Sequence, residues 1–167
     1  MITAIVYSSQ TGFTKAYAGL LAEKTGLPVH SLTERPEAQE VLYLGWLRAG
    51  KIVGLEEARK HYKTPCVCAV GMSPASESQI FQLRRENKVL GEDQLFYLQG
   101  GLDLARLKPP VRLVLKAICR SAAKKLSALS SRTPSEEATL QMTKGPYSAV
   151  SAENLADVLA WYEKTKE

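Results

Sequence analysis

The feature that most constrains the fold is the regular alternation of short apolar segments with segments of helical periodicity. Short apolar runs rich in β-branched residues predict strands, and apolar residues three or four positions apart predict helices. Strands that alternate with helices favour a parallel sheet with helices on both faces. The predicted strands cover 2–7, 27–32, 40–45, 65–71 and 94–99, and the predicted helices cover 12–25, 55–62, 76–88 and 152–164.

This pattern predicts both the fold class and the place of a binding site. We expect an α/β, doubly wound sheet of five parallel strands in the order 2-1-3-4-5. In that order, ligands bind outside the C-terminal ends of strands 1, 3 and 4, where the direction of winding changes. The chain has 167 residues, which is enough for one sizeable core, so we assign 1–167 to a single domain.

The apolar segments also bear on where the protein works. The longest run without a charged residue spans 64–76, which is too short for a membrane-spanning helix. No basic segment precedes the first apolar run, so we expect no secretory signal. Cys66 and Cys68 should lie on the same side of one strand as buried thiols, and three cysteines do not suggest a disulfide framework. A reducing, cytoplasmic location is therefore expected.

Positive charge is concentrated in one stretch of the chain. The net charge is +5, yet residues 104–134 contain eight lysines and arginines and no acid, so the remainder is mildly acidic. A localised basic segment argues for one partner surface rather than for a nucleic-acid binder.

The basic stretch lies within an insert at about 102–135, between the fifth strand and the last helix. A helical pattern covers 110–129, and 127–135 is expected to be a flexible exit. The helix is either a packed surface helix with a solvated basic face, or a lid or interfacial helix that meets an anionic membrane, an acidic partner or a carboxylate-bearing substrate through 108–129. Its cations are Lys108, Arg112, Lys116, Arg120 and Lys124, and its apolar face comprises Val111, Val114, Leu115, Ile118, Ala122, Leu126 and Leu129.

A loop rich in hydroxyl groups joins the first strand to the first helix. It contains Ser9, Thr11 and Thr14, and Gly12 allows the backbone to approach a ligand closely. The start of a helix offers free backbone N–H groups and partial positive charge, both of which favour an anion. Because the loop itself has no Lys or Arg, it predicts a phosphate held by neutral donors.

The segment Ser9-Gln-Thr-Gly-Phe-Thr14 resembles the T/S-x-T-G-x-T phosphate loop of the flavodoxins, and it occupies the same place after the first strand. The resemblance implies a flavodoxin-like fold with FMN as the cofactor. The resemblance implies that the loop after the fourth strand, residues 71–75, forms one wall of the flavin-ring site. This loop lacks the acidic residue and the aromatic of typical flavodoxins, so the outer cover of the ring should differ. The resemblance implies phosphate contacts from Ser9, Gln10, Thr11, Gly12, Phe13 and Thr14, and ring contacts from Trp46, Leu47, Arg48, Met72 and Ser73.

Other chemistries fit the sequence less well. The spacing Gly45-x-x-x-x-Gly50-Lys51 is that of a nucleotide-triphosphate loop, but the next residue is Ile52, which cannot ligate magnesium as Ser or Thr would. His30 and His61 stand alone without metal-ligand spacing, so we expect no metal site. No nucleophile-elbow motif indicates a Ser–His hydrolase.

The insert resembles that of the bacterial flavodoxin-type protoporphyrinogen oxidases, in which a strand end reading GxL-R precedes a basic segment and the last helix. Here the stretch is Gln99-Gly-Gly-Leu-Asp-Leu-Ala-Arg106, followed by KPPVRLVLKAICRSAAKK. The layout implies an FMN-dependent oxidoreductase that acts on a small hydrophobic substrate with a quinone-type acceptor, peripheral at the inner face of the membrane. Two alternatives stay open: an electron carrier for a redox partner protein, and a non-catalytic scaffold. Arg48 and Lys51 should add positive charge beside the ring, and no residue is assigned to catalysis.

Overall fold

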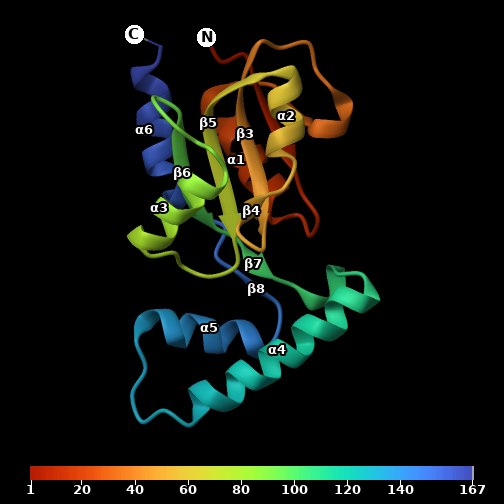
Figure 1. The fold of residues 1–167 in the computed structure, drawn as a ribbon, viewed down its shortest axis with the longest axis vertical. Coiled ribbons are helices and arrows are strands. Elements are labelled where there is room, and N and C mark those ends of the chain that lie inside the picture. The colour runs from red at the N-terminus through yellow and green to blue at the C-terminus, as the bar shows by residue number, and fades with distance from the viewer. Residues whose placement is uncertain (167) are drawn as a thin grey trace.

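The central sheet has the predicted strand order. In the computed structural model, which describes residues 1–166 apart from the side chain of Ser135, five parallel strands run in the order β2-β1-β3-β5-β6 (Figure 1). These are the first, second, third, fourth and fifth predicted strands, so the order 2-1-3-4-5 is confirmed. The strands are β1 (Ala4–Ser8), β2 (Val29–Ser31), β3 (Glu40–Arg48), β5 (Lys63–Gly71) and β6 (Gln94–Gln99).

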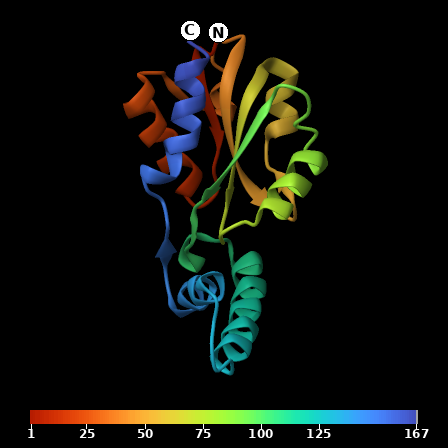
Figure 2. The same cartoon turned by 90° about the vertical axis from the view of Figure 1, so that its left-hand side faces the viewer.

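Helices cover both faces of the sheet, as predicted (Figure 2). On one face lie α1 (Phe13–Thr25) and α6 (Ala156–Lys164), and on the other lie α2 (Leu55–His61) and α3 (Glu77–Glu86). The last helix begins later than predicted, because a 3-10 turn occupies Glu153–Leu155 ahead of it. The arrangement is thus an α/β sandwich of three layers.

Each face of the sheet has its own apolar core. Ile5 of β1, Leu42 of β3 and Leu21 of α1 are fully buried in the core between the sheet and the helices α1 and α6. Cys66 and Cys68 belong to the same core and are fully buried, so the prediction that both thiols point to one side of a strand is confirmed. Burial of this kind is the main stabilising term for a sheet covered on both faces.

The third strand is longer than predicted. The sequence predicts a loop over 45–51, but β3 continues to Arg48 and then turns back into β4 (Lys51–Ile52). The two strands pair in antiparallel fashion, with Leu47 beside Ile52. The prediction of a loop is wrong because the backbone of this segment is used in a short hairpin.

One buried side chain holds this hairpin against α3. The Oδ1 atom of Asn87 accepts from the Ile52 amide at 2.8 Å, and its Nδ2 atom donates to the Gly50 carbonyl at 2.8 Å. Asn87 is 8% exposed, so both bonds are shielded from water. The hairpin therefore presents Trp46 and Arg48 from a fixed strand rather than from a mobile loop.

A helical hairpin projects beyond the C-terminal edge of the sheet (Figure 1). It consists of α4 (Pro109–Ser127) and α5 (Pro134–Lys144), and it is joined to the sheet by the antiparallel pair β7 (Gly101–Leu102) and β8 (Tyr147–Ser148). The predicted helix of the insert is confirmed as α4, but α5 is not predicted, so the insert extends past its predicted end. Within residues 1–166, no helix is long and apolar enough to cross a membrane.

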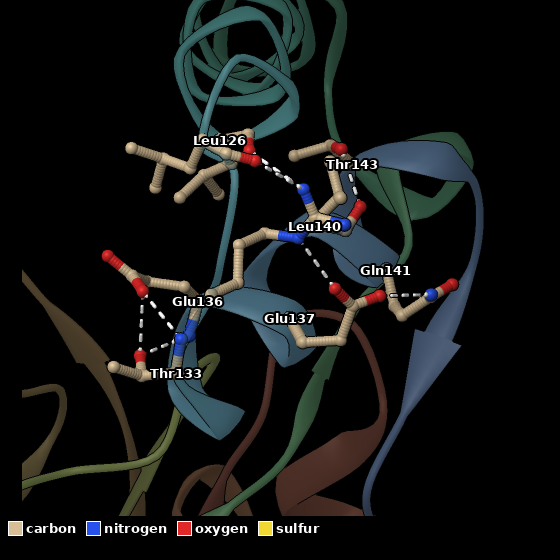
Figure 3. A network of polar contacts seen from close by, with 9 residues as sticks. Leu126, Thr133, Glu136, Glu137, Leu140, Gln141 and Thr143 are labelled. Carbon is tan, nitrogen blue, oxygen red and sulfur yellow. Dashed lines mark hydrogen bonds and ion pairs between the residues drawn. The ribbon is translucent and has the colours of Figure 1, made fainter.

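The predicted flexible exit after α4 is instead tied down by polar contacts (Figure 3). Arg132 donates through Nη1 to the Leu126 carbonyl at 3.1 Å and pairs through Nε with the Glu137 carboxylate at 2.8 Å. Thr133 caps α5, because its hydroxyl accepts from the Glu136 amide at 3.3 Å and the Glu136 carboxylate accepts from the Thr133 amide at 2.7 Å. This capping box fixes where α5 begins.

Candidate functional site

A cavity of about 560 Å³ lies between the C-terminal edge of the sheet and α4. The start of α1, the end of β3, the loop after β5 and the segment from β7 into α4 form its walls, which places it at the predicted switch point. Ser9, Gly12 and Ser73 do not line it. The predicted cofactor-binding residues that line it are Gln10, Thr11, Phe13, Thr14, Trp46, Leu47, Arg48 and Met72.

The loop before α1 forms one end of the cavity. Gly12 is the N-cap of α1 with φ 96°, and no side chain caps the helix there. The Ser9 hydroxyl oxygen accepts from the Gly12 amide at 3.1 Å, which leaves its own hydrogen free to donate. Thr14 is 1% exposed, lines the cavity, and makes no hydrogen bond through its hydroxyl to any other described residue. This end of the cavity therefore offers donors to an anion.

A cation that sequence reasoning missed lies over the same loop. Arg106 donates through Nη1 to the Thr11 carbonyl at 2.9 Å, and the same nitrogen is 3.1 Å from where a Cβ on Gly12 would lie. Asp103 holds Arg106 through an ion pair of 3.0 Å between Oδ2 and Nε. Thr11 and Arg106 are 95 residues apart in sequence, so their contact could not be predicted. The sequence signals at Arg106 were that it begins the basic stretch and that it ends the segment resembling GxL-R. The expected phosphate site of neutral donors alone is thus supplemented by one guanidinium.

The end of β3 supplies an aromatic wall. Trp46 lines the cavity, and the guanidinium carbon of Arg48 lies 6.0 Å from the centroid of the Trp46 ring. Lys51, expected to border a ring together with Arg48, does not line the cavity. Its Nζ atom donates instead to the Glu86 carbonyl at 2.7 Å, because the β3–β4 hairpin turns Lys51 toward the end of α3.

The loop after β5 supplies the opposite rim. Met72 lines the cavity and is 45% exposed, so this rim reaches the surface. Ser73 faces elsewhere: its carbonyl accepts a hydrogen bond from the Tyr97 hydroxyl. Burial raises the pKa of Tyr97 to about 12, so the hydroxyl stays protonated and keeps donating to the loop even in moderately alkaline solution.

The floor of the cavity comes from the insert. Leu107, Pro110, Val111, Val114 and Leu115 line it. The apolar face predicted for this helix is therefore divided between two tasks. Val111, Val114 and Leu115 face the cavity, and Ala122 and Leu126 are half-buried on the helix that α5 packs against. The other two predicted residues, Ile118 and Leu129, are exposed.

Comparison with protein-family models, with curated proteins and with solved structures gave no match. The chemistry must therefore be inferred from the site's own residues. They form a mostly apolar cavity with the Trp46 indole and the Arg48 guanidinium on one wall, and with helix amides and hydroxyls at one end. The Asp103 carboxylate also belongs to the lining, and its ion-pair partner Arg106 lies over the first loop, outside the lining. This arrangement suits an amphipathic ligand that combines a flat apolar part with an anionic group.

Proposed function

We propose that this chain is a flavodoxin-like FMN-binding redox protein, and that it acts as an oxidoreductase on a small hydrophobic substrate. The observation that carries the proposal is the placement of the Ser9–Thr14 loop at one end of an apolar cavity lined by Trp46. The cavity volume, about 560 Å³, lies within the range of about 300–1,000 Å³ that is typical of cofactor pockets.

The loop end fits a phosphate monoester. The uncapped first turn of α1 supplies backbone N–H groups and the positive end of the helix dipole. Thr14 can donate its hydroxyl from a site that water barely reaches. Arg106 lies over the same loop and can donate through its remaining N–H groups, although the Asp103 carboxylate offsets part of its positive charge. Arg106 is fixed by Asp103, so little conformational entropy is lost when it meets an anion.

The other end fits a flat ring. Trp46, Leu47 and Met72 offer apolar contacts, and the isoalloxazine ring of a bound FMN would supply the electron transfer. The floor from α4 is also apolar, with Val111 and Leu115 facing the space beneath the edge of the sheet. An apolar floor excludes water from this side and favours a hydrophobic substrate over a polar one.

An electron carrier is the second candidate, and the position of Met72 favours it. This residue lies at the rim of the cavity and is 45% exposed, so a partner protein could approach the ring edge there. A turnover assay separates the two functions. An oxidoreductase consumes reduced hydrophobic substrate with a soluble quinone as the only other component, whereas a carrier needs its partner.

Flavin binding is tested by titrating the purified chain with FMN and with riboflavin, which lacks the phosphate. FMN should bind more tightly. Thr14→Ala and Arg106→Gln should each weaken FMN binding by about 1.5–3 kcal/mol, the usual value of a hydrogen bond to a charged group, and leave riboflavin binding unchanged. Lys108→Gln is the matched control, because Lys108 is an exposed cation two residues away that, unlike Arg106, makes no hydrogen bond to the Ser9–Thr14 loop. Equal affinity for FMN and riboflavin, or no binding of either, contradicts the proposal.

A further inference from the structure

The rim of the cavity after β5 is held by one hydroxyl group. The rim segment, residues 72–75, joins β5 toward α3 and carries Met72, which lines the cavity. In the described part of the chain, the only hydrogen bond to this segment comes from the Tyr97 hydroxyl, which donates to the Ser73 carbonyl. Tyr97 belongs to β6, the strand beside β5, so the bond reaches the rim from within the sheet. The position of the rim therefore depends on a single side-chain donor.

The Tyr97 ring is itself fixed in place. It lies beside Ala69 of β5 in the sheet and packs against the core on the face that α2 and α3 cover. At Gly71 the ring fills the space that a side chain would occupy, because a Cβ there would lie 2.7 Å from the Cζ atom of Tyr97. A glycine at the end of β5 thus lets the phenol pass close to the backbone and reach Ser73. The hydroxyl is a donor on a packed ring rather than the tip of a mobile side chain.

The residues on either side of the rim segment are anchored separately. Before it, the Gly71 carbonyl accepts from the Gly100 amide at 2.7 Å. After it, the Ser76 hydroxyl accepts from the Gln79 amide at 3.3 Å, and the Gln79 side chain accepts from the Ser76 amide at 2.8 Å, which forms the capping box of α3. Between these two anchors, the Tyr97 hydroxyl holds the segment at its middle. Losing that bond would free the rim and leave both anchors intact.

We propose that Tyr97 is a positioning residue for the ring end of the cavity, and that its hydroxyl holds the rim so that Met72 contacts the flat apolar part of the ligand. The assignment rests on the proposed binding of FMN. Methionine sulfur is polarisable and contacts aromatic rings favourably. Met72 is 45% exposed, so packing alone does not hold it in place. A rim that is ordered before the ligand arrives reduces the conformational entropy that binding would otherwise cost.

The Tyr97 hydroxyl should matter to the ring end of the ligand and not to the phosphate end. Tyr97→Phe keeps the ring packed against Gly71 and removes the bond to the Ser73 carbonyl. It should weaken the binding of FMN and of riboflavin by the same factor, about three- to tenfold, the equivalent of about 0.7–1.4 kcal/mol. Thr14→Ala, by contrast, should weaken the binding of FMN alone, because riboflavin lacks the phosphate.

The test is titration of the full chain with riboflavin and with FMN, followed by visible absorbance, for the wild type, Tyr97→Phe, Met72→Ala and the double variant. Because Tyr97 is proposed to act through Met72, Tyr97→Phe should cause no further loss of affinity in the Met72→Ala background. Tyr62→Phe is the matched control. Tyr62 belongs to the same core and donates its hydroxyl to the Pro36 carbonyl at 3.2 Å, and neither residue lines the cavity. The control should keep the flavin affinity and the flavin absorbance band of the wild type.

Backbone order parameters from NMR relaxation report on the rim without any flavin. In the unliganded chain, the amides of Met72, Ser73 and Ala75 should become more mobile in Tyr97→Phe and should be unchanged in Tyr62→Phe.

The outcomes separate this assignment from the proposed function. Equal flavin affinity in the wild type and Tyr97→Phe overturns the assignment and leaves the proposed function standing, as do losses in Tyr97→Phe and Met72→Ala that simply add. A wild type that binds no flavin defeats the proposed function. Rim order parameters that are the same in the wild type and Tyr97→Phe then overturn the role of Tyr97 as well, whereas a more mobile rim in Tyr97→Phe alone supports it.

Discussion

The sheet with its four covering helices and the α4–α5 hairpin are built in opposite ways. In the sheet, entire side chains such as Ile5, Leu42 and Val67 are fully buried between two layers of helices. In the hairpin, α4 buries none of its residues, and Leu140 and Met142 are the buried apolar residues of α5. The sheet and its helices therefore derive their stability from their own core, whereas the α4–α5 hairpin keeps apolar side chains exposed.

The exposed apolar surface of the α4–α5 hairpin indicates where a ligand or partner would bind. A region that buries its apolar residues needs no partner, and a region that exposes them at a cavity has surface to offer. The hairpin is held by Arg132, by the capping box of Thr133 and by the strand pair β7–β8 rather than by a core.

The largest effect is expected for a matched pair of truncations. Leu42→Ala leaves a cavity between the sheet and α1 and should lower the free energy of unfolding by about 2–5 kcal/mol. Val114→Ala removes a side chain that is 60% exposed and should change it by less than about 0.5 kcal/mol. Urea unfolding followed by circular dichroism measures both. Similar losses for the two variants would show that the hairpin has a core of its own.

The next effect concerns the β3–β4 strand hairpin, which presents Trp46 to the cavity. Asn87→Ala leaves the buried Ile52 amide without its acceptor, and it should cost about 1–3 kcal/mol in unfolding free energy. Gln82→Ala on the same helix breaks only an exposed contact with Glu86 and serves as the control. The account of a rigid β3–β4 hairpin fails if both variants keep wild-type stability.

A smaller effect should be confined to the insert. Thr133→Ala removes the N-cap of α5 and should weaken that helix by about 1 kcal/mol. Hydrogen exchange of the α5 amides should quicken while exchange in β1 and β3 stays unchanged, because the capping box lies outside the sheet. Thr143→Ala, which loses only a bond to the Leu140 carbonyl within the same helix, is the control. Equal quickening in the sheet would show that the two regions unfold together.

The smallest effect is electrostatic. If FMN binds as proposed, Arg48 adds positive charge near the ring and favours its reduced, negatively charged form. Arg48→Gln should lower the midpoint potential for full reduction, but by no more than about 30 mV, since Arg48 is exposed and water screens it. Lys51→Gln should have no effect, because Lys51 is directed to α3. A raised potential in Arg48→Gln would refute the sign of the argument.

Much of the sheet could be predicted from sequence, and much of the insert could not. Buried strands such as β5 carry unbroken apolar runs, and Gly26 marks the end of α1 with a positive φ, so local patterns sufficed. The β3–β4 hairpin was not predicted from sequence, because the contacts that hold it come from Asn87, which is far along the chain. The helix α5 was not predicted, because its sequence is only weakly amphipathic and the helix is stabilised by its capping box and by contact with α4.

The candidate site shows the same division. Thr11, Thr14 and Trp46 could be placed at one edge because parallel strands end together. Arg106 could not, because its contact with Thr11 depends on how the segment after β7 folds back over the first loop. The face of α4 at the floor of the cavity could be predicted as apolar. Its position against the cavity could not, because the direction that α4 takes after β7 depends on tertiary contacts and not on local sequence.

If the edge of the sheet and α4 together enclose one cofactor site, bulk added on the cavity side of α4 should weaken FMN binding, and bulk added elsewhere on the helix should not. Val111→Trp should fill the cavity from its floor and weaken FMN binding at least tenfold, because Val111 lines the cavity. Leu113→Trp adds the same bulk two residues away, at an exposed position that does not line the cavity, and should bind FMN as the wild type does. Visible absorbance of the bound flavin reports both affinities. FMN binding by the wild type that Val111→Trp leaves unchanged, or equal losses in the two variants, would contradict the claim.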